Sequence, residues 1–232
     1  MCSLEKRGNI YILTLTGSDE HRLNPTLIDA IQAALSRLRS ELTSSSSALV
    51  TTAQGKYFSN GYDLAWAQSS LSRLQLMDFK LQSLISDFIS LPMPTIAAVT
   101  GHASAAGMIL ALSNDYVLMR KERGFLYMSE MDIGRVVPEW FMAMLKCKIG
   151  DANARRELIM KAVKMNAETA VERGIVYSAH QGSEETLEAA VGLAEELVKR
   201  GWDGNVYASN RLVLMREAVN KVEGKTKSKP KL

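Results

Sequence analysis

The sequence predicts an α/β protein whose core is followed by a helical C-terminal third. Up to residue 119, short apolar runs typical of buried strands alternate with longer segments whose apolar residues recur at helical spacing. Beyond residue 150 the pattern is mainly helical. Strands that alternate with helices indicate an α/β core, and the later helices form an appendage to it.

The first elements follow from apolar spacing and from residues that begin or end helices. The apolar run at 10–15 predicts a strand. Asn24 and Pro25 predict a helix start, because asparagine caps helices and proline fits their first turn. This helix continues to Leu42, and a short serine loop then leads to a second strand at 48–53.

The rest of the chain repeats this alternation. Glycines interrupt the pattern between 55 and 61, and Pro92 and Pro94 end a long helix. The expected elements are helices at 71–91 and 105–113, strands at 95–100 and 115–119, and helices at about 152–162, 167–173, 185–200 and 205–222. We divide the chain into a core at 1–195 and a C-terminal helix with a basic tail at 196–232.

Composition excludes several classes of protein. The chain has 232 residues, of which 47% are hydrophobic and 23% charged, as in globular rather than disordered proteins. No stretch approaches the roughly 18 apolar residues of a membrane span, and the first residues lack a secretory signal. Cys2 and Cys147 are too few for a disulfide framework, which favours a reducing compartment.

The net charge of +3 comes from the end of the chain. Residues 225–232 carry four lysines and no acid; without them, 24 of the 28 basic residues remain against 25 acids. We therefore expect no nucleic-acid partner, because such proteins spread basic residues over a face. The sequence contains no C-x-x-C or H-E-x-x-H motif, so we expect no protein-held metal.

Two strand-to-helix junctions are the most informative motifs. They are FSNGYDL at 58–64, after the strand at 48–53, and GHASAAG at 101–107, after the strand at 95–100. Small residues allow close approach to the backbone, and helix N-termini present unpaired N–H groups. Two such junctions side by side would aim two N–H donors at one oxygen and form an oxyanion hole.

These segments resemble a known family. FSNGYDL resembles F-S-A-G-x-D-L, the first oxyanion motif of the crotonase (enoyl-CoA hydratase/isomerase) superfamily, and 94–119 resembles the second motif with its helix. HRLNPTL at 21–27 is similar to the segment that contacts coenzyme A, and 167–176 resembles a late A-x-x-A-x-x-x-G-L-V element. The resemblance covers roughly 5–200 and implies a crotonase fold of repeated ββα units with a helical C-terminal region. It also implies a homotrimer or hexamer.

The resemblance also assigns roles by position. The main-chain N–H groups of Tyr62 and Ala106 would form the oxyanion hole for the oxygen of an acyl-CoA thioester. Asn60 and Ala106 replace the family's usual small residues, but both keep a backbone N–H. The residues expected to bind the substrate are Arg22, Asn60, Gly61, Asp63, Leu64 and Gly107. No cofactor is expected, because coenzyme A is part of the substrate.

The acid/base groups distinguish the reactions within the superfamily. Hydratases carry a glutamate at the position of Ile109, and isoleucine cannot activate water, so hydration is disfavoured. Segment 127–134 resembles the N-E-x-x-x-G of Δ3-Δ2-enoyl-CoA isomerases, which implies Glu130 as the catalytic carboxylate; 137–140 resembles their A-P-x-W. One carboxylate suffices to remove a proton at C2 and return it at C4, and apolar neighbours would raise its pKa. We expect conversion of 3-cis- or 3-trans-enoyl-CoA to 2-trans-enoyl-CoA in the β-oxidation of unsaturated fatty acids.

Three other functions stay open. A dienoyl-CoA isomerase or an unusual hydratase would need a second carboxylate, for which Asp132 and Glu139 are the candidates. A catalytically silent acyl-CoA-binding protein would bind the thioester without turnover. A serine hydrolase using Ser104 is more distant, because the segment lacks the closing glycine of G-x-S-x-G.

The end of the chain resembles a targeting signal. Pro230-Lys231-Leu232 departs from the S-K-L tripeptide at its first position but resembles variants accepted in plants by the peroxisomal import receptor. The preceding lysines would keep this tripeptide extended and accessible. We therefore expect a peroxisomal location, which suits an enzyme of fatty-acid degradation.

Overall fold

The computed structural model describes residues 1–17, 19–42 and 46–226. Its larger sheet is mixed, since β1 pairs antiparallel with β2 and the other neighbours run parallel. In spatial order the strands are β1 (Cys2–Arg7), β2 (Ile10–Leu15), β3 (Ala48–Ala53), β5 (Thr95–Val99), β7 (Tyr116–Arg120) and β9 (Ser178–His180).

A smaller parallel sheet follows the order β4 (Tyr57–Ser59), β6 (His102–Ser104) and β8 (Leu126–Tyr127). Each of its strands comes directly after a strand of the larger sheet and before a helix. These successive ββα units confirm the predicted fold. The short strands were not predicted, because two or three residues are too few to show a period.

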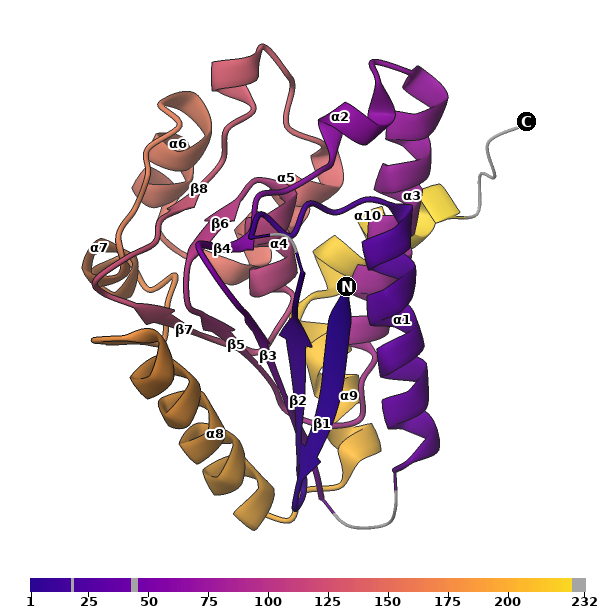
Figure 1. Cartoon of the computed structure of the whole chain (residues 1–232), viewed down its shortest axis with the longest axis vertical. Helices are drawn as coiled ribbons and strands as arrows, with labels where there is room; N and C mark the ends of the chain where they lie inside the picture. Colours follow the sequence, from indigo (N-terminus) through magenta and orange to yellow (C-terminus); the bar gives the residue numbers. More distant parts are fainter. Residues whose placement is uncertain (18, 43–45, 227–232) are drawn as a thin grey trace.

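Helices cover both faces of the larger sheet (Figure 1). The α-helices of the described residues are α1 (Pro25–Ser40), α2 (Leu64–Ala67), α3 (Leu71–Ile89), α4 (Ala106–Leu112), α5 (Glu139–Lys148), α6 (Ala152–Met160), α7 (Ala167–Glu172), α8 (Ser183–Lys199), α9 (Gly204–Leu214) and α10 (Arg216–Thr226). Helix α8 lies along one face of the sheet, while α1, α3, α4 and α5 contribute to the core on the other. α10 packs against both α3 and α5.

The central strands bury side chains on both faces. In β2, Ile12 faces the layer that contains α8, whereas Leu13 faces the larger core. In β3, Val50 likewise faces the layer that contains α8, and Leu49 faces the larger core. Strands buried on both faces have continuous apolar runs instead of alternation, which is why short apolar runs predicted them.

The structure differs from the sequence-based prediction at both ends. β1 was not predicted, because it is a largely exposed edge strand rich in charge; the turn at Gly8 and Asn9 is the signal that precedes β2. The helix expected at 205–222 is two helices, α9 and α10, which meet at the buried Met215. The division proposed at 195/196 falls within α8 and stays a prediction.

Candidate active site

Gly61 brings the two junctions into contact. It has φ +73°, and a Cβ at this position would lie 2.9 Å from the Ser104 carbonyl oxygen and 3.5 Å from the Ala106 nitrogen. Gly107 is equally confined, because its Cβ would overlap the Ser59 carbonyl. Glycine at both positions therefore lets the start of α2 and the start of α4 lie side by side.

The Tyr62 N–H is oriented by the peptide to which it belongs. The Gly61 carbonyl accepts a hydrogen bond from the Leu23 N–H at 2.8 Å. Because the C=O and N–H of a trans peptide point in opposite directions, the Tyr62 N–H points away from Leu23. Among the described residues this N–H has no hydrogen-bond partner.

The second N–H belongs to Ala106, the first residue of α4, where helical partners are missing. It too has no hydrogen-bond partner within the described part of the chain. The preceding Ala105 has φ 48° and ψ −117°, a conformation that costs free energy for a residue with a Cβ. The Ala105 N–H donates to the Tyr127 carbonyl at 2.8 Å and helps to hold this conformation.

A cavity of about 550 Å³ opens beside these junctions. Its walls come from α3, the segment between β8 and α5, and the junctions themselves. Of the predicted site residues, Arg22, Asn60, Tyr62, Leu64 and Glu130 line this cavity. The backbone-shaping residues Gly61, Ala106 and Gly107 lie behind that lining, where their contacts join the two junctions.

Glu130 is a buried carboxyl in the wall of the cavity. The residue is 6% exposed, and its Oε2 atom is buried without a hydrogen-bond partner among the described residues. Burial raises its pKa, and a hydrogen bond from its own backbone opposes this shift. A carboxyl with a raised pKa and an unoccupied oxygen can accept a proton and give it back.

Arg22 and Asn60 both contact Glu20 at the edge of the cavity. The Arg22 guanidinium pairs with the Glu20 carboxylate at 2.5 Å, and the Asn60 amide donates to the same carboxylate at 3.2 Å. Arg22 thus keeps its cationic group in a defined place beside the cavity.

Asp63 has a structural role that the sequence did not reveal. Its carboxylate caps α2 by accepting from the Trp66 N–H at 2.9 Å, and it accepts from the Asn24 side chain at the same distance. Asn24 in turn caps α1, as predicted from the sequence. The pair fastens the start of α1 to the start of α2.

The candidate residues for the alternative reactions either lie outside the cavity or lack the hydrogen-bond partner that the reaction would need. Asp132 is exposed, and Glu139 is exposed and pairs with Lys221 at 3.1 Å; neither lines the cavity. Ser104 lines it, with its hydroxyl 3.3 Å from that of Ser129, but in the described structure no imidazole hydrogen-bonds to it. Ile109 is fully buried in α4.

Asp78 is a carboxylate of the cavity wall that sequence reasoning missed. Among the described residues, it and Glu130 are the carboxylates that line the cavity. A signal was present in the sequence: Leu74, Asp78 and Leu81 recur at helical spacing, which places an acid on the apolar face of α3. An acid on a buried face needs hydrogen-bond partners.

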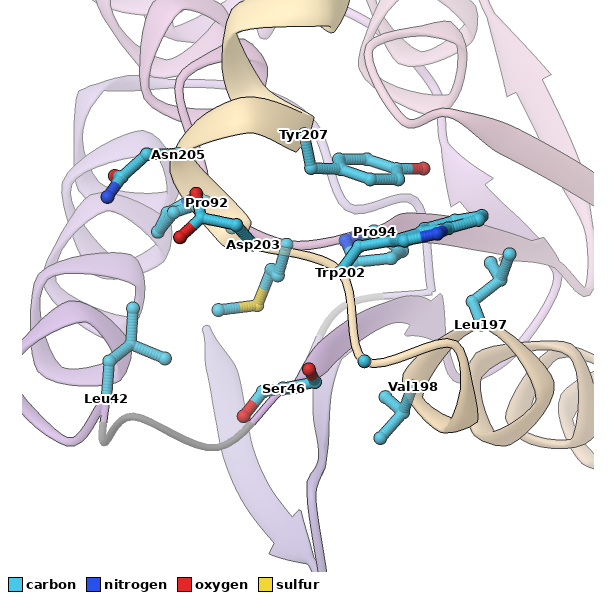
Figure 2. A pocket seen from close by; sticks show the side chains of 14 residues that line it. Leu42, Ser46, Pro92, Pro94, Leu197, Val198, Trp202, Asp203, Asn205 and Tyr207 are labelled. Carbon is cyan, nitrogen blue, oxygen red and sulfur yellow. The ribbon is translucent and has the colours of Figure 1, made fainter.

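A second cavity, of about 460 Å³, lies where α8 meets α9 and shares no lining residue with the first. Figure 2 shows the rings of Trp202 and Tyr207 one above the other, with centroids 5.8 Å apart. Among the described residues that line it, the carboxylate is Asp203, whose side chain caps α9. This cavity has no group arranged like Glu130.

The described residues contain no cluster of three His, Cys, Asp or Glu side chains able to hold a metal ion. In the same residues, no helix combines the length and apolar character needed to cross a membrane.

Comparison with known proteins gives the family. The sequence model described as enoyl-CoA hydratase/isomerase matches residues 5–225. The chain belongs to this family. Enoyl-CoA delta isomerase 1, peroxisomal, of Arabidopsis thaliana is 58% identical over 94% of this chain and 91% of its own length. Enoyl-CoA delta isomerase 3 of the same plant is 48% identical over 96% of this chain and 95% of its own.

Solved structures of the enoyl-CoA hydratase/isomerase family have the same fold. An apo enoyl-CoA isomerase of Mycobacterium tuberculosis superposes with a TM-score of 0.87 over 96% of this chain and 94% of its own, at 22% identity. A family member from Pseudomonas syringae gives 0.88 over 98% and 95%, also at 22%. At this identity the likeness shows the fold alone.

Proposed function

We propose that this protein is an enoyl-CoA isomerase that converts a 3-enoyl-CoA to the 2-trans-enoyl-CoA. The observation that carries the proposal is the buried, unpartnered Glu130 oxygen in a cavity beside two N–H groups without partners. The names of the Arabidopsis relatives, which are enoyl-CoA delta isomerases, support the same reaction.

In the proposed mechanism, the ionised Glu130 removes a proton from C2 of the substrate. Negative charge then spreads over a dienolate and collects on the thioester oxygen, which accepts hydrogen bonds from the N–H groups of Tyr62 and Ala106. Glu130 returns its proton at C4 and is ionised again. The double bond moves from C3–C4 to C2–C3 with no net loss or gain of atoms, so no further cofactor takes part.

The remaining predicted residues have supporting roles in this proposal. Asn60 and Leu64 border the acyl-CoA thioester, and Arg22 offers a cation to its phosphates. Gly61 and Gly107 keep the two N–H groups close together, and Asp63 holds the start of α2. Hydration is disfavoured because the buried Ile109 cannot activate water.

The test incubates the purified protein with 3-cis-hexenoyl-CoA. Ultraviolet absorbance follows the formation of the conjugated 2-enoyl thioester. We expect turnover in the natural protein and a loss of about 10²-fold or more in Glu130→Gln, with acyl-CoA binding retained. Glu139→Gln, which changes an exposed glutamate, serves as the matched control. Binding without turnover in the natural protein would instead indicate a silent acyl-CoA-binding protein.

We further propose that the protein acts in the peroxisome. Two of the Arabidopsis relatives are named peroxisomal, and a third is not. The tripeptide Pro230-Lys231-Leu232 lies outside the described residues. A fluorescent protein carrying residues 223–232 should enter peroxisomes of plant cells, and the same fusion without the last three residues should stay outside. Entry of both fusions would show that import does not depend on this tripeptide, and would contradict its recognition by the import receptor.

The assembly that we propose is a homotrimer or a hexamer. Light scattering coupled to size-exclusion chromatography distinguishes these from a 25.6 kDa monomer. A monomer at micromolar concentration would contradict this part of the proposal.

A further inference from the structure

We propose that Asp78 is a positioning residue of the isomerase site, which fixes the side chain of Tyr62 and thereby the direction of the Tyr62 main-chain N–H. The inference rests on the proposed function, because it concerns the same oxyanion hole. Asp78 lies on α3 and lines the cavity that also contains Glu130.

Three donors converge on the Asp78 carboxylate. Its Oδ1 accepts from the Tyr62 hydroxyl at 3.0 Å and from the Trp140 indole at 2.8 Å, and its Oδ2 accepts from the Gln82 amide at 2.7 Å. Trp140 and Gln82 are 0% and 2% exposed. The carboxylate thus joins α3 to the first junction and to α5, through hydrogen bonds strengthened by its charge.

This arrangement suits an anchor better than a second base. Both Asp78 oxygens are occupied by donors, whereas Glu130 keeps one without a partner. Burial, reinforced by the Asp78 charge, raises the pKa of Tyr62 well above its usual value. The phenol therefore stays protonated and keeps donating to Asp78 over the physiological range of pH.

The main chain around Tyr62 is held on both sides, and Asp78 adds an attachment through the side chain. The Leu23 N–H donates to the Gly61 carbonyl, and the Leu64 N–H donates to the Tyr62 carbonyl at 3.0 Å. The Tyr62 hydroxyl donates to Asp78 on α3. Gly61 itself, at φ +73°, allows more rotation than another residue would. Loss of the Asp78 contact would remove the side-chain attachment of Tyr62 and leave only main-chain hydrogen bonds to hold its N–H in place. A misplacement of about 1 Å can cost about 10²-fold in rate.

The kinetic test compares Asp78→Asn, Tyr62→Phe and the double variant. We expect each single change to lower kcat about tenfold or more while KM stays within about twofold, because the lost interaction acts in the transition state. The double variant should be no more than about twofold worse than the more damaged single one, since both remove the same contact.

Asp87→Asn is the matched control. Asp87 also lies on α3 and accepts from a side chain of α1, the Gln32 amide at 2.7 Å, but it does not line the cavity. A purely structural role for Asp78 predicts that Asp78→Asn and Asp87→Asn lower the unfolding temperature and leave kcat per folded molecule unchanged. That result would overturn the inference.

A second measurement needs no turnover. The absorbance of 2,4-hexadienoyl-CoA should shift to longer wavelength when its carbonyl accepts hydrogen bonds in the site. We expect a smaller shift in Asp78→Asn and in Tyr62→Phe at saturating ligand, and a full shift in either would overturn the inference. If Asp78→Asn does not fold, Tyr62→Phe decides alone. A shift without isomerisation in the natural protein would refute the proposed reaction. The comparison of the spectral shifts in the variants would then still test the role of Asp78.

Discussion

Arg211 and Asp115 form an ion pair inside the protein, although 96 positions separate them. The guanidinium lies 2.6 and 2.5 Å from the two carboxylate oxygens, and the side chains are 2% and 15% exposed. The same guanidinium donates to the main-chain carbonyls of Ile89, Leu91 and Met93. One side chain of α9 therefore holds the end of α3, the turn after it and the start of β7.

Arg211→Met should lower the free energy of unfolding by about 3–5 kcal/mol, because it leaves a buried carboxylate and buried carbonyls without their partner. Urea unfolding measures this loss. Arg216→Met, which removes an exposed arginine from the next helix, should change stability by less than about 0.5 kcal/mol. Equal effects of the two changes would contradict the anchoring role of Arg211.

Gly61→Ala should abolish most of the activity, with a loss of about 10²-fold or more if the Tyr62 N–H is an oxyanion donor. The added Cβ would press on the Ser104 carbonyl at a positive φ, so stability should also fall by about 1 kcal/mol or more. Gly150→Ala, where nothing lies within 4 Å, is the control. Full turnover in Gly61→Ala would show that the Tyr62 N–H is not part of the oxyanion hole.

Asp63→Ala should lower the free energy of unfolding by about 1–2 kcal/mol, because α2 loses its cap and the Asn24 side chain loses its acceptor. Asp63→Asn should recover most of this loss, since asparagine caps helices equally well. Thermal unfolding compares the two variants. A raised KM with unchanged stability in Asp63→Ala would mean that Asp63 contacts the substrate instead.

Glu130→Gln should make the protein more stable at pH 8 than the natural chain. Burial raises the pKa of Glu130 in the folded state above its unfolded value of about 4.3. The protonated carboxyl is therefore favoured on folding, and that stabilising contribution is lost as pH rises through the folded pKa. The advantage of the glutamine should shrink toward pH 4. A difference that does not vary with pH would refute this account.

The pH dependence of the rate follows from the same shift. In the proposed mechanism Glu130 must be ionised to remove the C2 proton, so kcat/KM should decline on the acidic side at a pH above the ordinary glutamate value. A pH profile measured with 3-cis-hexenoyl-CoA checks this. A decline centred at or below the ordinary glutamate pKa would show that another group limits the reaction.

The sequence predicts elements whose stabilising contacts repeat along the chain. The strands around Leu13 and Val50 and the helix around Leu81 are apparent from apolar spacing alone. The roles of Asp78 and Arg211 were not predictable in this way, because Trp140 and the Met93 carbonyl lie 62 and 118 positions away from them. Glu130 was named through family resemblance, since periodicity carries no information about a lone acid between β8 and α5.

The packing of α10 against α3 and α5 has a consequence for the order of events during synthesis. Those two helices contribute Asp78 and Phe141 to the cavity wall, and they are translated well before their support at 216–226. Because a chain leaves the ribosome from its N-terminus, the wall stays without this backing until α10 has been translated. A nascent chain that does not yet include α10 should therefore expose apolar surface and depend on chaperones until this helix is made.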